Sequence, residues 1–255
     1  MRARKRFGQN FLHDPRVIAR IVDALDPQPQ QRLVEIGPGR AALTAPVLAR
    51  SGRLDVVEID RDLAHDLRAR EEAGLTVHEA DALAFDFTAL SQQYNAPLRV
   101  FGNLPYNIST PILFHLIEHV DVISDMLFML QKEVVERIVA QPGNKTYGRL
   151  TIMLAVALRA ESLFTIGPGA FVPAPKVESA IVRLTPLPQP LVDHETLNSM
   201  RMIVTQAFSQ RRKTLRNALR GLVSAETMES CGLDPKQRPE TVDPKQFAAL
   251  AQSRL

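Results

Sequence analysis

Short apolar runs, each bounded by turn residues, alternate with stretches of helical spacing over the first half of the chain. Runs of this length favour buried strands, and the stretches between them favour amphipathic helices. We expect strands at residues 32–37, 54–60, 75–81, 98–103 and 125–133. Alternation of strands with helices implies a mostly parallel sheet that helices cover on both faces.

Two further apolar runs, at residues 161–168 and 179–187, have no long helical stretch between them. We expect this pair to close the sheet in antiparallel orientation, as its sixth and seventh strands. The Pro-rich segment 185–190 predicts a hinge, and only helical patterns follow it. The sequence therefore predicts an α/β domain over residues 1–185 and a small all-helical domain over residues 190–255.

The composition excludes several classes of protein. An apolar share of 45% over 255 residues is enough for a packed core, and no run approaches the length of a membrane span. The N-terminus lacks the apolar stretch of a signal peptide. A single cysteine, Cys231, excludes an internal disulfide framework and suits a reducing compartment. We therefore expect a cytoplasmic protein, and we expect it to be a monomer.

The net charge of +3 is unevenly distributed. Residues 1–185 hold equal numbers of acids and bases, whereas residues 186–255 hold ten Lys and Arg against seven Asp and Glu. Residues 201–220 have six bases and no acid, and residues 2–6 add four bases. A solvated helix face is the ordinary explanation of a charge run, but such a face normally mixes signs. The pattern favours a nucleic acid partner.

Candidate ligand-binding residues follow each of the first four expected strands. In an open parallel sheet, ligands bind outside the carboxyl ends of the strands. The residues at those ends are Gly37-Pro38-Gly39, then Glu58, then Asp81-Ala82, then Asn103-Leu104-Pro105-Tyr106. Glycines let a ligand approach the backbone, and a carboxylate can accept both hydroxyls of a ribose. Taken singly, these residues could form a turn, lie on the surface or cap a helix. Taken together, they indicate that the strand ends line one ligand-binding crevice.

The segment GPGRAA (37–42) with Glu58 also fits a dinucleotide-binding fingerprint, so an NAD enzyme is an alternative. Pro38 opposes it, because proline removes an N–H that could face a pyrophosphate. Hydride transfer would also give residues Asn103–Tyr106 no chemical role. A nucleoside ligand without phosphates fits better, and we expect S-adenosylmethionine. His115 and His119 have the spacing of two metal ligands, but no third ligand is evident, so we expect no metal.

Five segments carry a resemblance to a known family: RKRFGQNFL (4–12), EIGPGRAALT (35–44), FGNLPYNIST (101–110), PGAFVPAPKVESAIVRL (168–184) and FSQRRKTLRNAL (208–219). Together they resemble the ribosomal RNA adenine dimethyltransferases, and within that family the bacterial small-subunit enzymes linked to kasugamycin sensitivity. The resemblance implies a Rossmann-like methyltransferase sheet that uses S-adenosylmethionine. It also implies N6,N6-dimethylation of two adjacent adenosines in a hairpin near the 3' end of 16S ribosomal RNA, within an immature ribosomal particle.

The resemblance also implies a role for individual residues. The cofactor-binding residues would be Asn10 and Leu12 from the N-terminal segment, Gly37 and Gly39 at the methionine end, Glu58 at the ribose, Asp81 and Ala82 at the adenine, and Asn103 beside the sulfonium. Arg40 departs from the family, since many members have a small or apolar residue after the second glycine. The resemblance gives the charge of Arg40 no role.

The chemistry of an exocyclic amine suggests how the Asn-Leu-Pro-Tyr segment works. Adenine N6 is a poor nucleophile because its lone pair is delocalised into the ring. The side-chain carbonyl of Asn103 and the backbone carbonyl of Leu104 could accept its two hydrogens, while Tyr106 stacks on the extruded base. Phe171 is a candidate for the other side of the base, or else a core residue.

We expect basic residues of the last domain to bind RNA phosphates, namely Arg211, Arg212, Lys213, Arg216 and Arg220. The cluster at residues 2–6 would add to it. An RNA-binding assembly factor, for which methylation is secondary, is a second hypothesis that the sequence leaves open.

Overall fold

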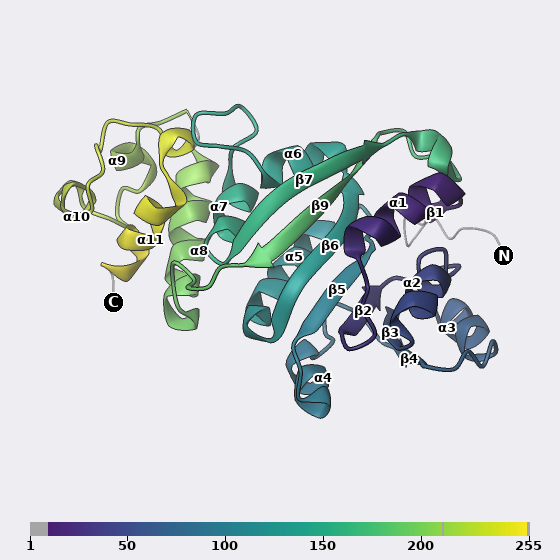
Figure 1. Ribbon diagram of the computed structural model, residues 1–255. Helices are drawn as coiled ribbons and strands as arrows, with labels where there is room; N and C mark the ends of the chain where they lie inside the picture. Colours follow the sequence, from purple (N-terminus) through teal and green to yellow (C-terminus); the bar gives the residue numbers. More distant parts are fainter. Residues whose placement is uncertain (1–9, 211, 254–255) are drawn as a thin grey trace. The chain divides into compact units, whose positions relative to one another are not determined.

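The computed structural model of the chain describes residues 10–210 and 212–253 (Figure 1). Within those residues, seven strands form one sheet in the order β4-β3-β2-β5-β6-β9-β7. Their bounds are β2 Arg32–Ile36, β3 Leu54–Glu58, β4 Leu75–Glu79, β5 Leu98–Asn103, β6 Ile123–Gln131, β7 Leu158–Ile166 and β9 Ser179–Pro186. The strands from β4 to β6 are parallel, and β9 runs antiparallel to β6. The expected α/β sheet is confirmed.

The helices of the first part of the chain cover both faces of this sheet. α1 (Pro15–Leu25), α2 (Thr44–Ser51) and α3 (Arg61–Arg68) lie on one face, and α4 (Phe87–Tyr94) and α5 (Ser109–Glu118) lie on the other (Figure 1). Right-handed crossovers require this division, because the chain moves outward from β2 to β4 and then returns to β5 and β6. The reversal leaves a switch point between β2 and β5, where ligands bind in such sheets.

Local sequence signals fix where several helices begin. The Asp14 side chain accepts from the backbone N–H groups of Arg16 and Val17 at the start of α1, where Pro15 is the first residue. The side chains of Asp60 and Asp86 cap α3 and α4 in the same way. Acidic residues directly before these helices therefore fix where the chain turns into helix.

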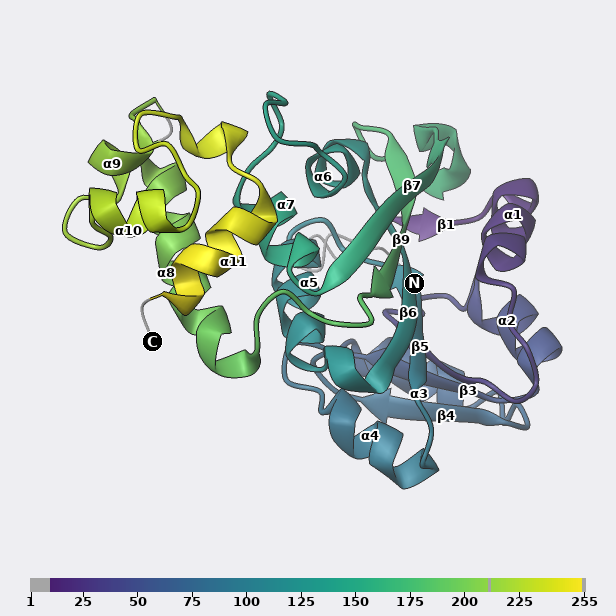
Figure 2. The ribbon, with the colours of Figure 1, turned by 60° about the vertical axis from the view of Figure 1, so that its left-hand side comes forward.

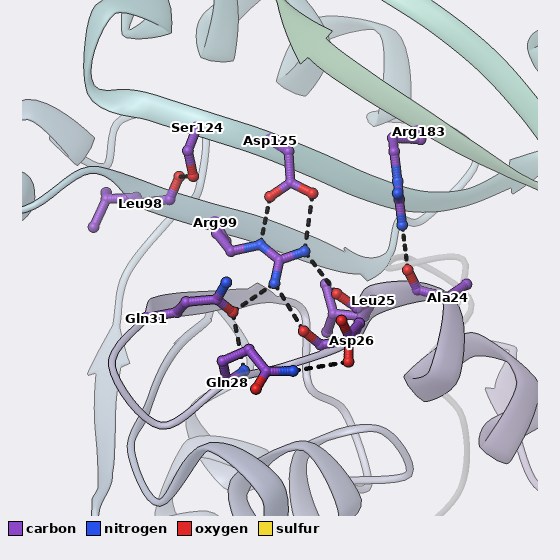
Figure 3. A network of polar contacts seen from close by, with 10 residues as sticks. All are labelled: Ala24, Leu25, Asp26, Gln28, Gln31, Leu98, Arg99, Ser124, Asp125 and Arg183. Atoms are coloured by element: carbon purple, nitrogen blue, oxygen red, sulfur yellow. Dashed lines mark hydrogen bonds and ion pairs between the residues drawn. The ribbon is translucent and has the colours of Figure 1, made fainter.

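A partly buried polar network holds the C-terminal end of α1 against the sheet (Figure 3). Arg99 of β5 forms a two-point ion pair with Asp125 of β6, at 2.6 and 3.0 Å. The same guanidinium donates to the carbonyl oxygens of Leu25 and Asp26 at 2.6 and 3.1 Å, and Arg183 donates to that of Ala24. The last carbonyls of a helix receive no hydrogen bond from within the helix. Two arginines supply the missing donors and so hold the end of α1 against the sheet.

A second, two-stranded sheet was not expected from the sequence. β1 (Phe11–Leu12) pairs antiparallel with β8 (Phe171–Val172), with Phe11 opposite Val172 and Leu12 opposite Phe171. β8 follows a 3-10 turn at Pro168–Ala170. Because only two residues separate β1 from α1, the anchored helix also fixes the position of β1.

The described chain divides into two compact units, and the division differs from the expected one. The second unit contains residues 186–255 and also residues 136–160, which the sequence placed in the first domain. Helix α7 (Arg149–Ala155) packs on α8 (His194–Ser209), and the buried Tyr147 donates its hydroxyl to Val242 O at 2.7 Å. These contacts join segments far apart in the chain, which hydropathy along the sequence does not reveal.

The other helices are short. α6 (Lys132–Ile138) follows β6, and the last part of the chain forms α9 (Leu215–Ala218), α10 (Ala225–Ser230), a 3-10 turn at Pro239–Thr241 and α11 (Pro244–Gln252). Figure 2 shows α8 and α11 side by side, and buried side chains such as Met200, Ile203, Phe247 and Leu250 form the core of the second unit. No helix among residues 10–210 and 212–253 has the length and apolar character needed to cross a membrane.

Candidate active site

A cavity of about 250 Å³ lies outside the carboxyl ends of β2, β3, β4 and β5, at the switch point. All the residues that the sequence assigned to the cofactor, and the three assigned to catalysis, line it. They are Asn10, Leu12, Gly37, Gly39, Glu58, Asp81, Ala82, Asn103, Leu104 and Tyr106. The fold thus brings together residues that are as many as 96 positions apart, between Asn10 and Tyr106.

The loop after β2 needs its glycines. Gly37 and Gly39 have φ values of +68° and +56°, a region that side chains with a Cβ rarely adopt. A Cβ on Gly39 would also lie 3.3 Å from the ring of Phe11. The glycines therefore allow this turn and the close packing of the Phe11 ring on Gly39, and both line the cavity, where a ligand can approach the main chain.

Glu58 is held as a rigid acceptor at the end of β3. It is 5% exposed, and its two carboxylate oxygens accept from the backbone N–H groups of Asp60 at 2.9 Å and Gly39 at 3.1 Å. Burial raises its pKa, while these hydrogen bonds act in the opposite direction. Each oxygen retains a second lone pair, so the carboxylate can still accept a pair of ligand hydroxyls.

Asp81 both stabilises a turn and lines the cavity. Its side chain accepts from Leu83 N at 2.9 Å and so stabilises the turn after β4. The residue is exposed and also lines the cavity beside the buried Ala82. Its turn role and a ligand-binding role are compatible.

Asn103 at the end of β5 has a fixed orientation. Its side-chain nitrogen donates to the backbone carbonyl of Asn10 at 3.0 Å, so the side-chain oxygen is the atom available as an acceptor. The next residue, Leu104, is held through its backbone N–H, which donates to Met129 O of β6 at 3.2 Å. Both carbonyl groups of the expected catalytic pair therefore belong to constrained backbone and side-chain positions.

Tyr106 is half-buried at the cavity wall. Its hydroxyl shares a 2.9 Å hydrogen bond with the Ser179 hydroxyl of β9. Burial raises the pKa of Tyr106, so the phenol stays neutral at physiological pH. The ring is thus a neutral, fixed surface in the cavity.

Phe171, the expected partner of Tyr106 in stacking on the base, does not line the cavity. The residue is 3% exposed, and it packs in the core with Leu12 and Ile166. It is absent from the described residues that line the cavity. The structure therefore places Phe171 as a core residue, since β8 pairs it with Leu12 of β1 and both belong to the buried apolar cluster.

Glu35 is a cavity residue that sequence reasoning missed. It is 2% exposed in β2, and the Thr44 hydroxyl donates to it at 2.6 Å. Burial raises the pKa of Glu35 to about 8, the Thr44 hydrogen bond opposes this, and nearby Glu58 adds to it. The signal in the sequence was an acidic residue inside an otherwise apolar strand.

The two histidines have structural partners. His115 forms a 2.9 Å hydrogen bond with Phe85 O, and His119 forms one of 2.8 Å with the Thr88 hydroxyl. Across the described part of the chain, no group of three or more His, Cys, Asp or Glu side chains could hold a metal ion.

The expected RNA-binding residues lie on the surface of the second unit where they are described. Arg212, Lys213, Arg216 and Arg220 belong to this surface. All four side chains are exposed. Arg211 and the basic residues at positions 2–6 lie outside the described residues.

The chain resembles known proteins over nearly its full length. A family model described as ribosomal RNA adenine dimethylase matches residues 1–253. Proteins named ribosomal RNA small subunit methyltransferase A are 52% identical in Nitrosococcus oceani and 54% identical in Pseudomonas aeruginosa. Each of these alignments covers 98% of this chain, with 95% and 94% of the relative.

Solved structures agree with this match. The crystal structure of the 23S rRNA methyltransferase ErmE has a TM-score of 0.73 and 26% identity, and covers 95% of this chain and 98% of that one. A dimethyladenosine transferase from Plasmodium falciparum has a TM-score of 0.80 at 24% identity, covering 94% and 95%, and shows the same fold. The chain belongs to the ribosomal RNA adenine dimethylase family and is an rRNA adenine dimethyltransferase that uses S-adenosylmethionine.

Proposed function

We propose that this dimethyltransferase modifies 16S ribosomal RNA of the small subunit, at N6 of two adjacent adenosines in a hairpin near its 3' end. Support for the small subunit comes from the relatives named above, which align with 98% of the chain. The observation that carries the chemistry is the orientation of Asn103, whose amide nitrogen is engaged by Asn10 O.

The cavity fits S-adenosylmethionine, which supplies a methyl group already activated on a sulfonium. Gly37 and Gly39 line the cavity and have no Cβ, so their backbone would pass close to its methionine end. Glu58 would hold the ribose hydroxyls. Asp81 and Ala82 would hold the adenine, and Asn10 and Leu12 would cover the cofactor from the N-terminal segment. The NAD alternative loses its support, since the family is one of methyltransferases.

The residues after β5 would prepare the target amine. The side-chain oxygen of Asn103 and the carbonyl of Leu104 would accept the two N6 hydrogens. Hydrogen bonds in these directions favour a pyramidal nitrogen whose lone pair points out of the ring plane. Positioning of this kind can supply most of the rate when the donor is already activated. No general base is required, because the methylated ammonium readily loses its proton to water.

Tyr106 would stack on the target base. A base within a helix cannot reach the cavity, so the adenosine must be extruded or already unstacked. The neutral ring of Tyr106 offers a π face, and its hydrogen bond to Ser179 limits rotation of the ring. The second methylation starts from an amine with one hydrogen, so one of the two carbonyls must then tolerate a methyl group.

The second unit would bind the RNA backbone. Residues 136–160 and 186–255 together hold fourteen Lys and Arg against eight Asp and Glu, whereas the rest of the chain holds seventeen against twenty. The second unit therefore has a net charge of +6 and the first a net charge of −3. We assign phosphate contacts to the Lys and Arg residues of segment 136–160, and to Arg211, Arg212, Lys213, Arg216 and Arg220.

The substrate would be ribosomal RNA within an immature particle in the cytoplasm, engaged by one copy of the chain. We expect an incompletely assembled particle to leave the hairpin free for base extrusion. The charge of the second unit also supports a second function, binding of the particle as an assembly factor independently of methyl transfer.

The experiment that tests the proposal is transfer of labelled methyl groups to immature small subunits that lack this modification. Dimethyladenine cannot pair normally, so reverse transcription should stop at two adjacent adenosines near the 3' end of the 16S RNA. Label in large-subunit RNA alone would refute the assignment of the substrate.

A further inference from the structure

Arg40 is the one cationic residue among the described residues that line the cavity. The lining also includes the carboxylates of Glu58 and Asp81, and the buried carboxyl of Glu35, whose raised pKa of about 8 keeps it protonated. S-adenosylmethionine has a single anionic group, the carboxylate of its methionine end. An acidic cavity would repel that group unless a cation compensates it.

Arg40 lies beside the glycine loop and Phe11. It directly follows Gly39, and its guanidinium lies 4.3 Å from the centre of the Phe11 ring in a cation–π contact. Its own carbonyl accepts from Arg70 at 3.4 Å. The side chain is exposed, so the guanidinium stands at the rim of the cavity, between the glycine loop and β1.

We propose that Arg40 is a cofactor-specificity residue, whose guanidinium binds the carboxylate of the cofactor's methionine end while Phe11 supports it. The proposal rests on the proposed placement of that end at the glycine loop. A planar guanidinium can donate two parallel hydrogen bonds to a carboxylate, a geometry that a lysine ammonium does not offer.

The test compares two ligands by isothermal titration calorimetry, S-adenosylhomocysteine and its analogue that lacks the carboxylate. The Arg40→Gln substitution should weaken binding of S-adenosylhomocysteine about two- to fivefold, the range for an ion pair near solvent. It should leave the affinity for the decarboxylated analogue unchanged. Arg40→Lys should retain part of the preference, because the charge remains and the two-point geometry is lost.

The matched control is Arg50→Gln, an exposed arginine of the same unit that pairs with Asp23 and does not line the cavity. It should change neither affinity. Equal weakening of both ligands by Arg40→Gln would overturn the proposal, since that result means a structural role, and so would no change in either. If the parent protein bound neither ligand, the proposed cofactor placement itself would fail, which is a distinct result.

Discussion

The side-chain amide of Asn103 donates a 3.0 Å hydrogen bond to the backbone carbonyl of Asn10, across 93 positions of sequence. This bond joins the end of β5 to the residue before β1. It determines which end of the Asn103 amide is available in the cavity. The N-terminal segment, which we propose covers the cofactor, therefore also orients the group that we assign to the target amine.

The Asn103→Asp variant tests this orientation. A carboxylate keeps an acceptor but has no N–H to donate, and it would repel the Asn10 carbonyl. Loss of one such hydrogen bond costs about 1–2 kcal/mol, so we expect single-turnover methyl transfer to slow about tenfold or more. If the Asn103→Asp variant were as fast as the parent, the Asn10 contact would be unimportant for catalysis.

Replacement of Tyr106 separates its ring from its hydroxyl. Base–aromatic stacking is worth about 1–3 kcal/mol, so Tyr106→Ala should lower kcat/KM for the RNA about tenfold or more. Tyr106→Phe keeps the ring and loses only the bond to Ser179, so its effect should be small. Ser179→Ala is the matched control and should behave like Tyr106→Phe. Equal losses in the Ala and Phe variants at position 106 would contradict stacking.

Glu35 makes the stability of the protein depend on pH. Its pKa is raised from 4.5 to about 8 by burial, so between these values the folded state holds a proton that the unfolded chain has lost. Stability should therefore fall as pH rises from about 4.5 to about 8. Glu35→Gln removes this titration and retains an acceptor for Thr44.

Thermal unfolding of both proteins at pH 5, 7 and 9 is the measurement. The Tm of the parent should decrease toward pH 9 by several degrees more than the Tm of Glu35→Gln, since about 1 kcal/mol corresponds to about 2–4 °C at this size. Parallel curves for the two proteins would mean that Glu35 is ionised in the folded state.

Neutralisation of the second unit should affect RNA binding alone. Each phosphate contact adds about 0.7–0.9 to the slope of log K against log salt. Arg216→Gln with Arg220→Gln should therefore reduce that slope by about 1.4–1.8 and leave cofactor affinity unchanged. Arg50→Gln with Arg61→Gln, two exposed arginines of the first unit, is the control and should leave the slope as it is. An unchanged slope in the first variant would remove these residues from the RNA contact.

Much of the fold was predictable from local pattern. The strands of the parallel part of the sheet are short apolar runs, and their expected bounds agree with the observed ones within two residues. The cavity residues were predictable for the same reason, since parallel strands present their carboxyl ends at one edge. The order of the strands along the chain was therefore enough to predict that Gly37, Glu58, Asp81 and Asn103 lie in one cavity.

What the sequence could not predict depends on contacts between distant segments. β1 and β8 have two residues each, too few for a periodic signal, and their pairing joins Leu12 to Phe171. The grouping of residues 136–160 with the C-terminal helices depends on the burial of Tyr147 and its bond to Val242. Whether Phe171 faced the core or a bound base was open for the same reason, because a two-residue strand has no detectable inward face.

The most direct test of the central claim is Asn103→Ala, with methyl transfer and binding to immature small subunits measured on the same preparation. The Asn103 oxygen is assigned to the target amine and the phosphate contacts to the second unit. We therefore expect transfer to fall by a factor of at least about a hundred, as when one preorganised polar group is removed. The particle affinity should stay at the parental value. Transfer at the parental rate would contradict the account.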